Sequence, residues 1–236
     1  MRDLAAIYRR TRRVLKSYFD RDIRQGIQVR IPTERYGSVY GGWTAAAGML
    51  NSDSTVYSVG IGEDVSFDLA LIDAYGLTIH AFDPTPRSID WLRKQRLPER
   101  FIFHPVGLAD FDGTAIFHPP SDPSFASYSM VFEAQQSTSE TVVKTDVRRL
   151  GSIMAELGHN SVDLLKMDIE GAEYDVIRDL LDQHLSIRQI LVEFHHRFPS
   201  VDIQKTREAI VSLNAAGYAI FFVSDTGEEY AFLKMA

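Results

Sequence analysis

The stretch Val56-Tyr-Ser-Val-Gly-Ile-Gly-Glu-Asp64 joins a short apolar run to two glycines and two acidic residues. A run of this kind, rich in β-branched and aromatic side chains, is typical of a strand buried on both faces of a parallel sheet. Ligands of open parallel sheets bind beyond the carboxyl ends of the strands. Gly60 and Gly62 follow the run, and glycine lets a ligand approach the backbone closely, so we expect a ligand-binding loop here.

Strand and helix patterns alternate along the chain from this point onward. This alternation predicts an α/β fold with a mostly parallel sheet and helices on both faces. Two final apolar runs, 218–224 and 228–235, flank a tight-turn signal and predict an antiparallel C-terminal strand pair. The other expected strands are 55–59, 77–82, 100–106, 162–167 and 189–194, and the expected helices are 64–75, 86–96, 171–184 and 202–216.

We interpret the chain as one main domain, residues 51–236, with two additions. A hairpin-like insertion at about 113–147 is positioned to act as a lid over the strand ends. Residues 1–50 are expected to form an N-terminal helical extension that packs on the core. This extension includes a basic amphipathic helix, the glycine-rich passage 36–43 and a short helix at 44–50.

Composition excludes several classes of protein. The 236 residues include no cysteine, which rules out disulfides and thiolate metal sites. The net charge is −7 although residues 1–30 hold 9 Lys/Arg and 3 Asp/Glu, so the remainder is acidic and a poor partner for nucleic acid. Because no apolar run is long enough to span a membrane and no secretory signal is apparent, we expect a cytoplasmic protein.

The glycine loop favours a particular kind of cofactor. Dinucleotide sites expect a G-x-G-x-x-G pattern, with the pyrophosphate at the N-terminus of the next helix. Here Gly60 and Gly62 have no third glycine, and Glu63 and Asp64 follow them, where they would repel a pyrophosphate. The loop therefore fits a cofactor that lacks phosphate and carries a positive charge, such as S-adenosylmethionine.

Two further strand ends offer groups to the nucleoside part of such a cofactor. Asp83 lies about 20 residues after the loop, the interval expected for a carboxylate that accepts hydrogen bonds from ribose hydroxyls, and Pro84 adjoins it. Asp83 is also suited to capping the helix that follows. Gly107 and Leu108 are expected to offer backbone groups to the adenine, while Asp110 either accepts from the adenine amine or is a surface turn residue.

Three acids crowd the end of the fourth strand, in the run Leu164-Leu-Lys-Met-Asp-Ile-Glu-Gly-Ala-Glu-Tyr-Asp-Val-Ile177. We expect Asp168 at the strand tip, facing the cleft, where its carboxylate would neutralise a sulfonium or an ammonium. Glu170 and Glu173 follow, although acids are also favoured in the first turn of any helix. Carboxylates at this spacing are able to bind a divalent ion, but we expect a site without metal.

The fifth strand ends in Leu191-Val-Glu-Phe-His-His-Arg197. A histidine at a strand tip is the usual general base near neutral pH. Strand alternation puts Glu193 and His195 on one face, so Glu193 is able to orient His195. We predict that His195 is the base, with Glu173 and then His196 as alternatives.

Together these motifs resemble the FkbM family of S-adenosylmethionine-dependent methyltransferases. The resemblance rests on VYSVGIGEDVSFDLALI, HAFDPTP, DLLKMDIEGAEYDVI and LVEFHHRF, and it spans roughly residues 36–235. It implies a Rossmann-like class I methyltransferase fold with a seven-stranded, mostly parallel sheet. It also implies methyl transfer, commonly to a hydroxyl oxygen of a sugar or a secondary metabolite.

The resemblance implies roles for individual residues. Gly60 and Gly62 look like the cofactor loop, Asp83 like the ribose acid, and Asp168 with Glu170 like the acids at the methionine and methyl-transfer end.

One position departs from the family pattern. Ser58 stands where such motifs usually have Asp or Glu, so the methionine ammonium is expected to rely on Glu63 or Asp168 instead. Residues 36–43 and 119–139 are expected to shape the acceptor pocket.

We therefore expect an S-adenosylmethionine-dependent O-methyltransferase that acts on a hydroxyl of a small molecule, a sugar or a glycan. Homo-oligomer formation is left open. An NAD-dependent Rossmann enzyme is the alternative enzyme class, and the missing third glycine argues against it. A non-catalytic cofactor-binding subunit, recruited to a partner through the basic N-terminal helix, is the alternative outside enzymes.

Overall fold

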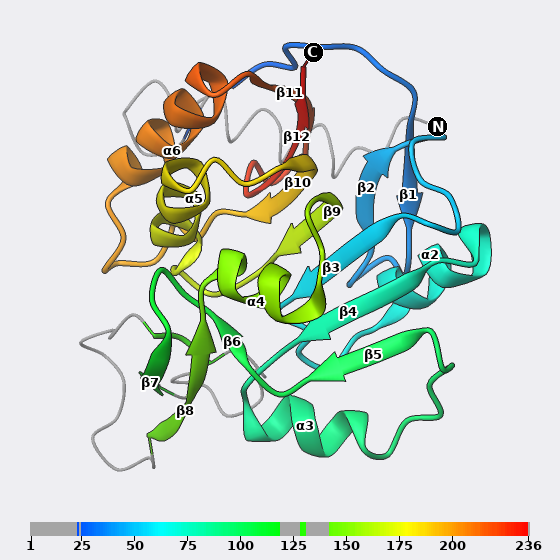
Figure 1. The fold of residues 1–236 in the computed structure, drawn as a ribbon. Coiled ribbons are helices and arrows are strands. Elements are labelled where there is room, and N and C mark those ends of the chain that lie inside the picture. Colours follow the sequence, from blue (N-terminus) through cyan, green and yellow to red (C-terminus); the bar gives the residue numbers. More distant parts are fainter. Residues whose placement is uncertain (1–22, 24, 119–127, 131–141, 236) are drawn as a thin grey trace.

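The structure, a computed structural model, describes residues 23, 25–118, 128–130 and 142–235. They contain a seven-stranded sheet with the order β11-β12-β10-β9-β3-β4-β5 (Figure 1). All seven strands run in one direction except β12, which pairs antiparallel with both β10 and β11. The predicted mostly parallel sheet with an antiparallel C-terminal pair is thus confirmed. The strands are β3 (Thr55–Val59), β4 (Thr78–Phe82), β5 (Phe101–His104), β9 (Val162–Met167), β10 (Ile187–Glu193), β11 (Tyr218–Val223) and β12 (Glu229–Lys234).

Helices cover both faces of this sheet. Three of them, α4, α5 and α6, lie over one face (Figure 1), whereas α2 and α3 pack on the other. Tyr57 of β3 enters the core under α4, α5 and α6, while its neighbour Val56 enters the core under α2 and α3. The strands are apolar throughout because successive side chains enter two separate cores. The helices are α2 (Ser66–Tyr75), α3 (Pro86–Leu92), α4 (Leu150–Leu157), α5 (Glu173–Asp182) and α6 (Ile203–Ala215).

Local signals account for several helix ends. The Asp202 side chain accepts a hydrogen bond from the backbone N–H of Gln204 at 2.9 Å and caps α6. Gly76, at φ 64°, ends α2 in the left-handed conformation that glycine adopts without strain. The helix α4 was not predicted, because its eight residues are too few for a helical period to stand out.

The prediction of a helix at 44–50 is wrong. Residues Trp43–Ala46 form strand β2, which pairs antiparallel with β1 (Thr33–Tyr36). All four β2 residues are buried, and the backbone N–H of Ala46 donates to the Gln189 side chain of β10 at 3.0 Å. Packing against the main sheet thus overrides the helix propensity of the alanines.

The predicted insertion does contain a hairpin. Strands β7 (Gly113–Phe117) and β8 (Val143–Arg148) pair antiparallel, and β6 (Gly107–Leu108) pairs parallel with β8. The segments 119–127 and 131–141 between them lie outside the described residues, as does the predicted basic helix within 1–20, so the lid and this helix stay predictions. Within the described part of the chain, no helix has the length and apolar character that crossing a membrane would require.

Strand order places the site. The chain runs from β3 outward to β4 and β5 and then returns to β9 and β10 on the other side of β3. The order therefore reverses between β3 and β9, and the carboxyl ends of these strands border the crevice in which sheets of this type bind ligands.

Candidate active site

A cavity of about 500 Å³ lies at the carboxyl ends of β3, β4, β9 and β10. The glycine loop after β3 forms part of its wall, and residues of the β6–β8 sheet close one end. Acidic residues after β9, at the end of β10 and at the start of β12 close the other end. The loop after β3 and the carboxyl ends of β4, β9 and β10 therefore border one continuous cavity.

Gly60 and Gly62 both line this cavity, and each has a positive φ, of 79° and 58°. A Cβ atom on Gly60 would lie 1.7 Å from the backbone oxygen of Asp168, because the tips of β3 and β9 pass in direct contact. A Cβ on Gly62 would meet no atom within 4 Å. Gly60 is thus required for strand packing, whereas Gly62 leaves its side of the loop open to a ligand.

The two acids after the glycines have partners within the protein. Glu63 forms a bidentate ion pair with Arg87, at 3.1 and 3.0 Å, and this hydrogen bonding lowers the pKa of Glu63. Asp64 accepts from the backbone N–H of Ser66 at 2.7 Å and from the Ser38 hydroxyl at 3.0 Å. Both acids line the cavity, and Asp64 also ties the glycine loop to the loop between β1 and β2.

Asp83 lines the cavity but is only 4% exposed. Its Oδ2 accepts from the backbone N–H groups of Ile61 and Gly62 and from the Ser88 hydroxyl, all at 3.0 Å. Its Oδ1 accepts from the backbone N–H of Thr85 at 2.9 Å and from the Thr85 hydroxyl at 2.6 Å. Since a carboxylate offers about four acceptor positions, a ribose hydroxyl that bonded to Asp83 would replace one of these donors.

The end of the cavity beyond Asp83 is largely apolar. Gly107 is packed tightly, since a Cβ there would lie 3.0 Å from Pro84 and 3.1 Å from Val147. Asp110 does not line the cavity and instead pairs with Arg178 at 3.4 Å. This end is lined by Phe82, Pro84, Gly107, Leu108, Phe117, Tyr128 and Met130.

Ser58 lies behind the cavity wall. It is 1% exposed, does not line the cavity and, among the described residues, its hydroxyl has no hydrogen-bond partner. The buried Asp68 of α2 lies close to it, and burial raises the pKa of Asp68 to about 6. An acid therefore occupies this region, but it comes from α2 and not from the end of β3.

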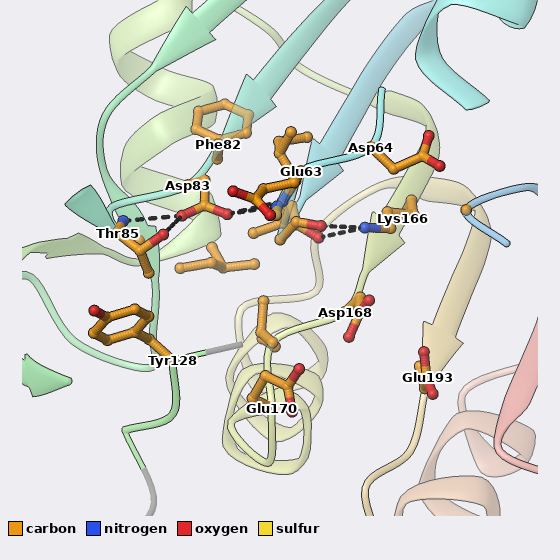
Figure 2. A pocket seen from close by; sticks show the side chains of 18 of the residues that line it. Glu63, Asp64, Phe82, Asp83, Thr85, Tyr128, Lys166, Asp168, Glu170 and Glu193 are labelled. Carbon is orange, nitrogen blue, oxygen red and sulfur yellow. Dashed lines mark hydrogen bonds between the residues drawn. The ribbon is translucent and has the colours of Figure 1, made fainter. Parts of the chain in front are cut away.

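The opposite end of the cavity is acidic. Asp168, Glu170 and Glu193 line it together with Glu228 and Glu229, which precede and begin β12. Burial raises the pKa of Glu193, and the negative charge of Asp168 raises it further, to about 8, although His195 acts in the opposite direction. Among the described residues Glu193 forms no ion pair within 4 Å, so its carboxylate is left facing the cavity (Figure 2).

His195 is enclosed by three carboxylates. Its Nδ1 lies 3.3 Å from Glu173, and its Nε2 lies 3.3 Å from Glu170 and 3.5 Å from Asp168. Ionised carboxylates only accept hydrogen bonds, so both ring nitrogens must carry protons to bond with them. Burial lowers the pKa of His195, but the hydrogen bond that its ring donates to Glu173 and the three negative charges outweigh this effect and raise the pKa to about 10.

Glu173 holds His195 in place through hydrogen bonds. It is fully buried, and its carboxylate accepts from the backbone N–H groups of Gly171 and His195, both at 2.9 Å. Neither Glu173, His195 nor His196 lines the cavity. Glu170 does line it, with a backbone φ of 51° that is uncommon outside glycine and marks a tightly determined turn.

One group of described residues has the geometry of a possible metal site. Asp168, Glu193 and His195 each offer a ligand atom, and these atoms lie within 4.8 Å of one another. A metal ion would have to displace the Nε2 proton of His195, which the surrounding carboxylates hold strongly. The three surrounding carboxylates therefore favour the protonated form of His195 over a metal ligand.

Lys166 is a cavity residue that was not predicted. It is only 6% exposed, and its ammonium donates to the backbone oxygen of Val59 at 3.2 Å and to that of Gly60 (Figure 2). The available signal was a single lysine inside the apolar strand Val162–Met167, which favours a paired or functional charge.

Much of this chain is similar in sequence to known proteins. A profile described as the methyltransferase FkbM domain matches residues 56–220. The probable methyltransferase-like protein 24 of Rattus norvegicus is 30% identical over 159 residues, 66% of this chain but only 37% of its own length. The 31-O-demethyl-FK506 methyltransferase FkbM of Streptomyces tacrolimicus is 25% identical over 62% of this chain and 67% of its own. The 2-O-methyltransferase NoeI of Sinorhizobium fredii is 27% identical over 49% and 53%.

The chain thus spans little more than a third of the rat protein. The matched region nevertheless runs from β3 into β11 and includes the glycine loop, Asp83, the acidic run after β9 and His195. Since the family profile covers well over half of the chain, including the carboxyl ends of β3, β4, β9 and β10 that border the cavity, the chain belongs to the FkbM family of methyltransferases.

Proposed function

We propose that this chain transfers a methyl group from S-adenosylmethionine to a hydroxyl oxygen of a small molecule or a sugar. FkbM methyltransferases use this cofactor, which supplies an activated methyl group. Two relatives are named as O-methyltransferases or for an O-demethyl substrate, which supports oxygen as the acceptor atom. The observation that carries the proposal is the cavity itself, apolar at one end, acidic at the other and open at Gly62 between them.

The described residues suit such a cofactor. The apolar end, with Phe82, Leu108 and Tyr128, is suited to an adenine ring, and the acidic end is suited to the positive charges of the sulfonium and the amino group. Asp83 holds the glycine loop against which the ribose would lie. The same acidic wall disfavours a pyrophosphate and hence an NAD-dependent enzyme.

A hydroxyl acceptor needs a base for its proton, and we assign this role to Glu193. Its carboxylate faces the cavity and has a raised pKa, which is the condition for a base that works near neutral pH. His195 is already protonated and lies behind the wall, so we propose that it positions Asp168 and Glu170 instead of accepting a proton. Placement of the acceptor would supply much of the remaining rate.

The loop between β1 and β2 is placed to contact an acceptor as large as a sugar or an aromatic compound. Tyr40 and Gly41 of this loop line the cavity beside Trp43, and Tyr40 is 89% exposed. An exposed tyrosine at a cavity mouth is suited to stacking on a sugar or on an aromatic acceptor. The predicted contribution of 119–139 rests here on Tyr128 and Met130, since most of that segment lies outside the described residues.

The proposal is tested by titrating the chain with S-adenosylhomocysteine and with NAD, and then by offering methyl-labelled cofactor with panels of sugars, phenols and aliphatic alcohols. We expect binding of S-adenosylhomocysteine but not of NAD, and transfer of label to oxygen in at least one class. Tight NAD binding would favour the dehydrogenase alternative. Cofactor binding without transfer to any panel, together with a stable protein complex that is lost on deleting residues 1–25, would favour a non-catalytic partner subunit.

A further inference from the structure

Lys166 is a buried cation in the wall of an acidic cavity. It lies near the end of β9, two residues before Asp168, and its side chain reaches across to the end of β3 (Figure 2). The Trp43 ring lies 5.3 Å from its ammonium nitrogen and covers one side of it. Packing and two backbone acceptors therefore hold the charged group in one place at the edge of the glycine loop.

The ammonium group lacks a close counter-ion among the described residues. Two of its three N–H groups are used by the carbonyls of Val59 and Gly60, and no described carboxylate forms an ion pair with it within 4 Å. Asp64 and Asp68 interact with the charge of Lys166 only over longer distances. A cation this deeply buried is costly unless an anion pairs with it, so the remaining N–H is available to an anionic ligand.

Charge elsewhere in the cavity restricts where such an anion can bind. Of the described residues that line the cavity, Lys166 is the one with a positive side chain. The acids that line it are Glu63, Asp64, Asp83, Asp168, Glu170, Glu193, Glu228 and Glu229. A ligand with one negative group would therefore be drawn to Lys166, while a positive group on the same ligand would find Asp168 close by on the same strand end.

We propose that Lys166 binds the carboxylate of the amino-acid part of the cofactor, an assignment that rests on the proposed function. An α-amino acid carries a carboxylate and an ammonium on one carbon, and the end of β9 presents an ammonium and a carboxylate two residues apart. The third N–H of Lys166 donates to the ligand carboxylate, and Asp168 accepts from the ligand ammonium. Such charge-assisted hydrogen bonds are the stronger kind.

The experiment compares three ligands by calorimetric titration of the full chain. They are S-adenosylhomocysteine, its decarboxylated analogue, which lacks only the carboxylate, and 5′-methylthioadenosine, which lacks the amino-acid part. The wild-type chain should bind S-adenosylhomocysteine at least tenfold more tightly than the decarboxylated analogue, a difference of about 1.4 kcal/mol. Lys166→Met, similar in length but uncharged, should lose this preference while keeping its affinity for the other two ligands.

Lys144→Met is the matched control, because it removes an exposed lysine of β8 outside the cavity and should change none of the affinities. Equal weakening of all three ligands in Lys166→Met would show that Lys166 only holds the glycine loop, and would overturn the inference. If Lys166→Met fails to fold, the wild-type chain decides: equal affinity for S-adenosylhomocysteine and its decarboxylated analogue would overturn it. Binding of none of the ligands by the wild type would instead refute the proposed function.

Discussion

Replacing His195 by Gln should change how the stability of the fold depends on pH. His195 is 8% exposed and lies among Asp168, Glu170 and Glu173, so its protonated form is stabilised in the folded state. Its folded pKa of about 10 lies above the ordinary value of 6.5. A raised folded pKa contributes stability that is fully present below about pH 6.5 and is lost as the pH rises through about 10.

The size of this effect follows from the two pKa values. Between pH 7 and complete deprotonation, the difference in proton affinity corresponds to about 4 kcal/mol. Because Asp168 is 31% exposed and water screens its charge, we expect roughly half of this or more to be measured, about 2 to 4 kcal/mol. That is a large part of the roughly 5 to 15 kcal/mol that stabilises a typical folded protein.

The assay is urea unfolding of the wild type and of His195→Gln at intervals from about pH 6.5 to about pH 10.5. The wild type should be the more stable protein near neutral pH, and the gap should shrink steadily as the pH rises. Titrating groups remote from His195 are common to both proteins and cancel in the difference. Glu193 does not cancel, because the charge of His195 lowers its pKa, so the comparison is repeated in a Glu193→Gln background. The exposed His184 provides the control, since His184→Gln should show no gap that closes in this range. A gap for His195→Gln that stays constant, or an imidazole ¹⁵N resonance of His195 that titrates near its ordinary value, would refute the reasoning.

Three further perturbations test other parts of the site. Once an acceptor is known, the rate of methyl transfer should rise with pH through about 8, as Glu193 loses its proton. Glu193→Gln should lower this rate and abolish its rise with pH, and an unchanged pH profile would remove Glu193 from the mechanism. In thermal unfolding, Gly60→Ala should destabilise the chain by several kcal/mol more than Gly76→Ala. Both glycines have a positive φ, but only at Gly60 would the added Cβ clash with a backbone atom. Equal losses of stability would contradict the close contact of the strand tips. Asp83→Asn places an amide NH2 group against backbone and hydroxyl donors and should lower the free energy of unfolding by about 1 to 3 kcal/mol. The control Asp90→Asn, at an exposed position, should lower it little. Similar losses for the two variants would show that the loop does not depend on the Asp83 carboxylate.

Much of the fold was predictable because it depends on local pattern. Alternating apolar runs and amphipathic segments predicted the strands that form the seven-stranded sheet, and the turn near Gly227 predicted the C-terminal pair. The elements that were missed, β1, β2, β6 and α4, are all short. The strand β2 is decided by its burial against the main sheet, and α4 is two turns long.

The candidate site was predictable at the level of strand ends. Gly60, Gly62, Asp83, Asp168 and Glu170 all border one cavity, because the carboxyl ends of parallel strands meet at one edge. The sequence alone thus predicted these five cavity-lining residues, whereas it missed Lys166 and placed His195 and Glu173 in the cavity that they do not line.

The chemical state of those residues was decided only by the tertiary structure. Three carboxylates, two of them from the turn after β9 and one from the start of α5, surround His195 and keep it protonated, and no spacing in the sequence specifies that enclosure. Two hydrogen bonds of Asp83 to the loop after β3, and the contact of Lys166 with the end of β3, likewise depend on backbone groups distant in the sequence. Proton affinity and charge pairing are set by distances of a few ångströms between segments far apart in the chain, and such distances exist only once the chain has folded.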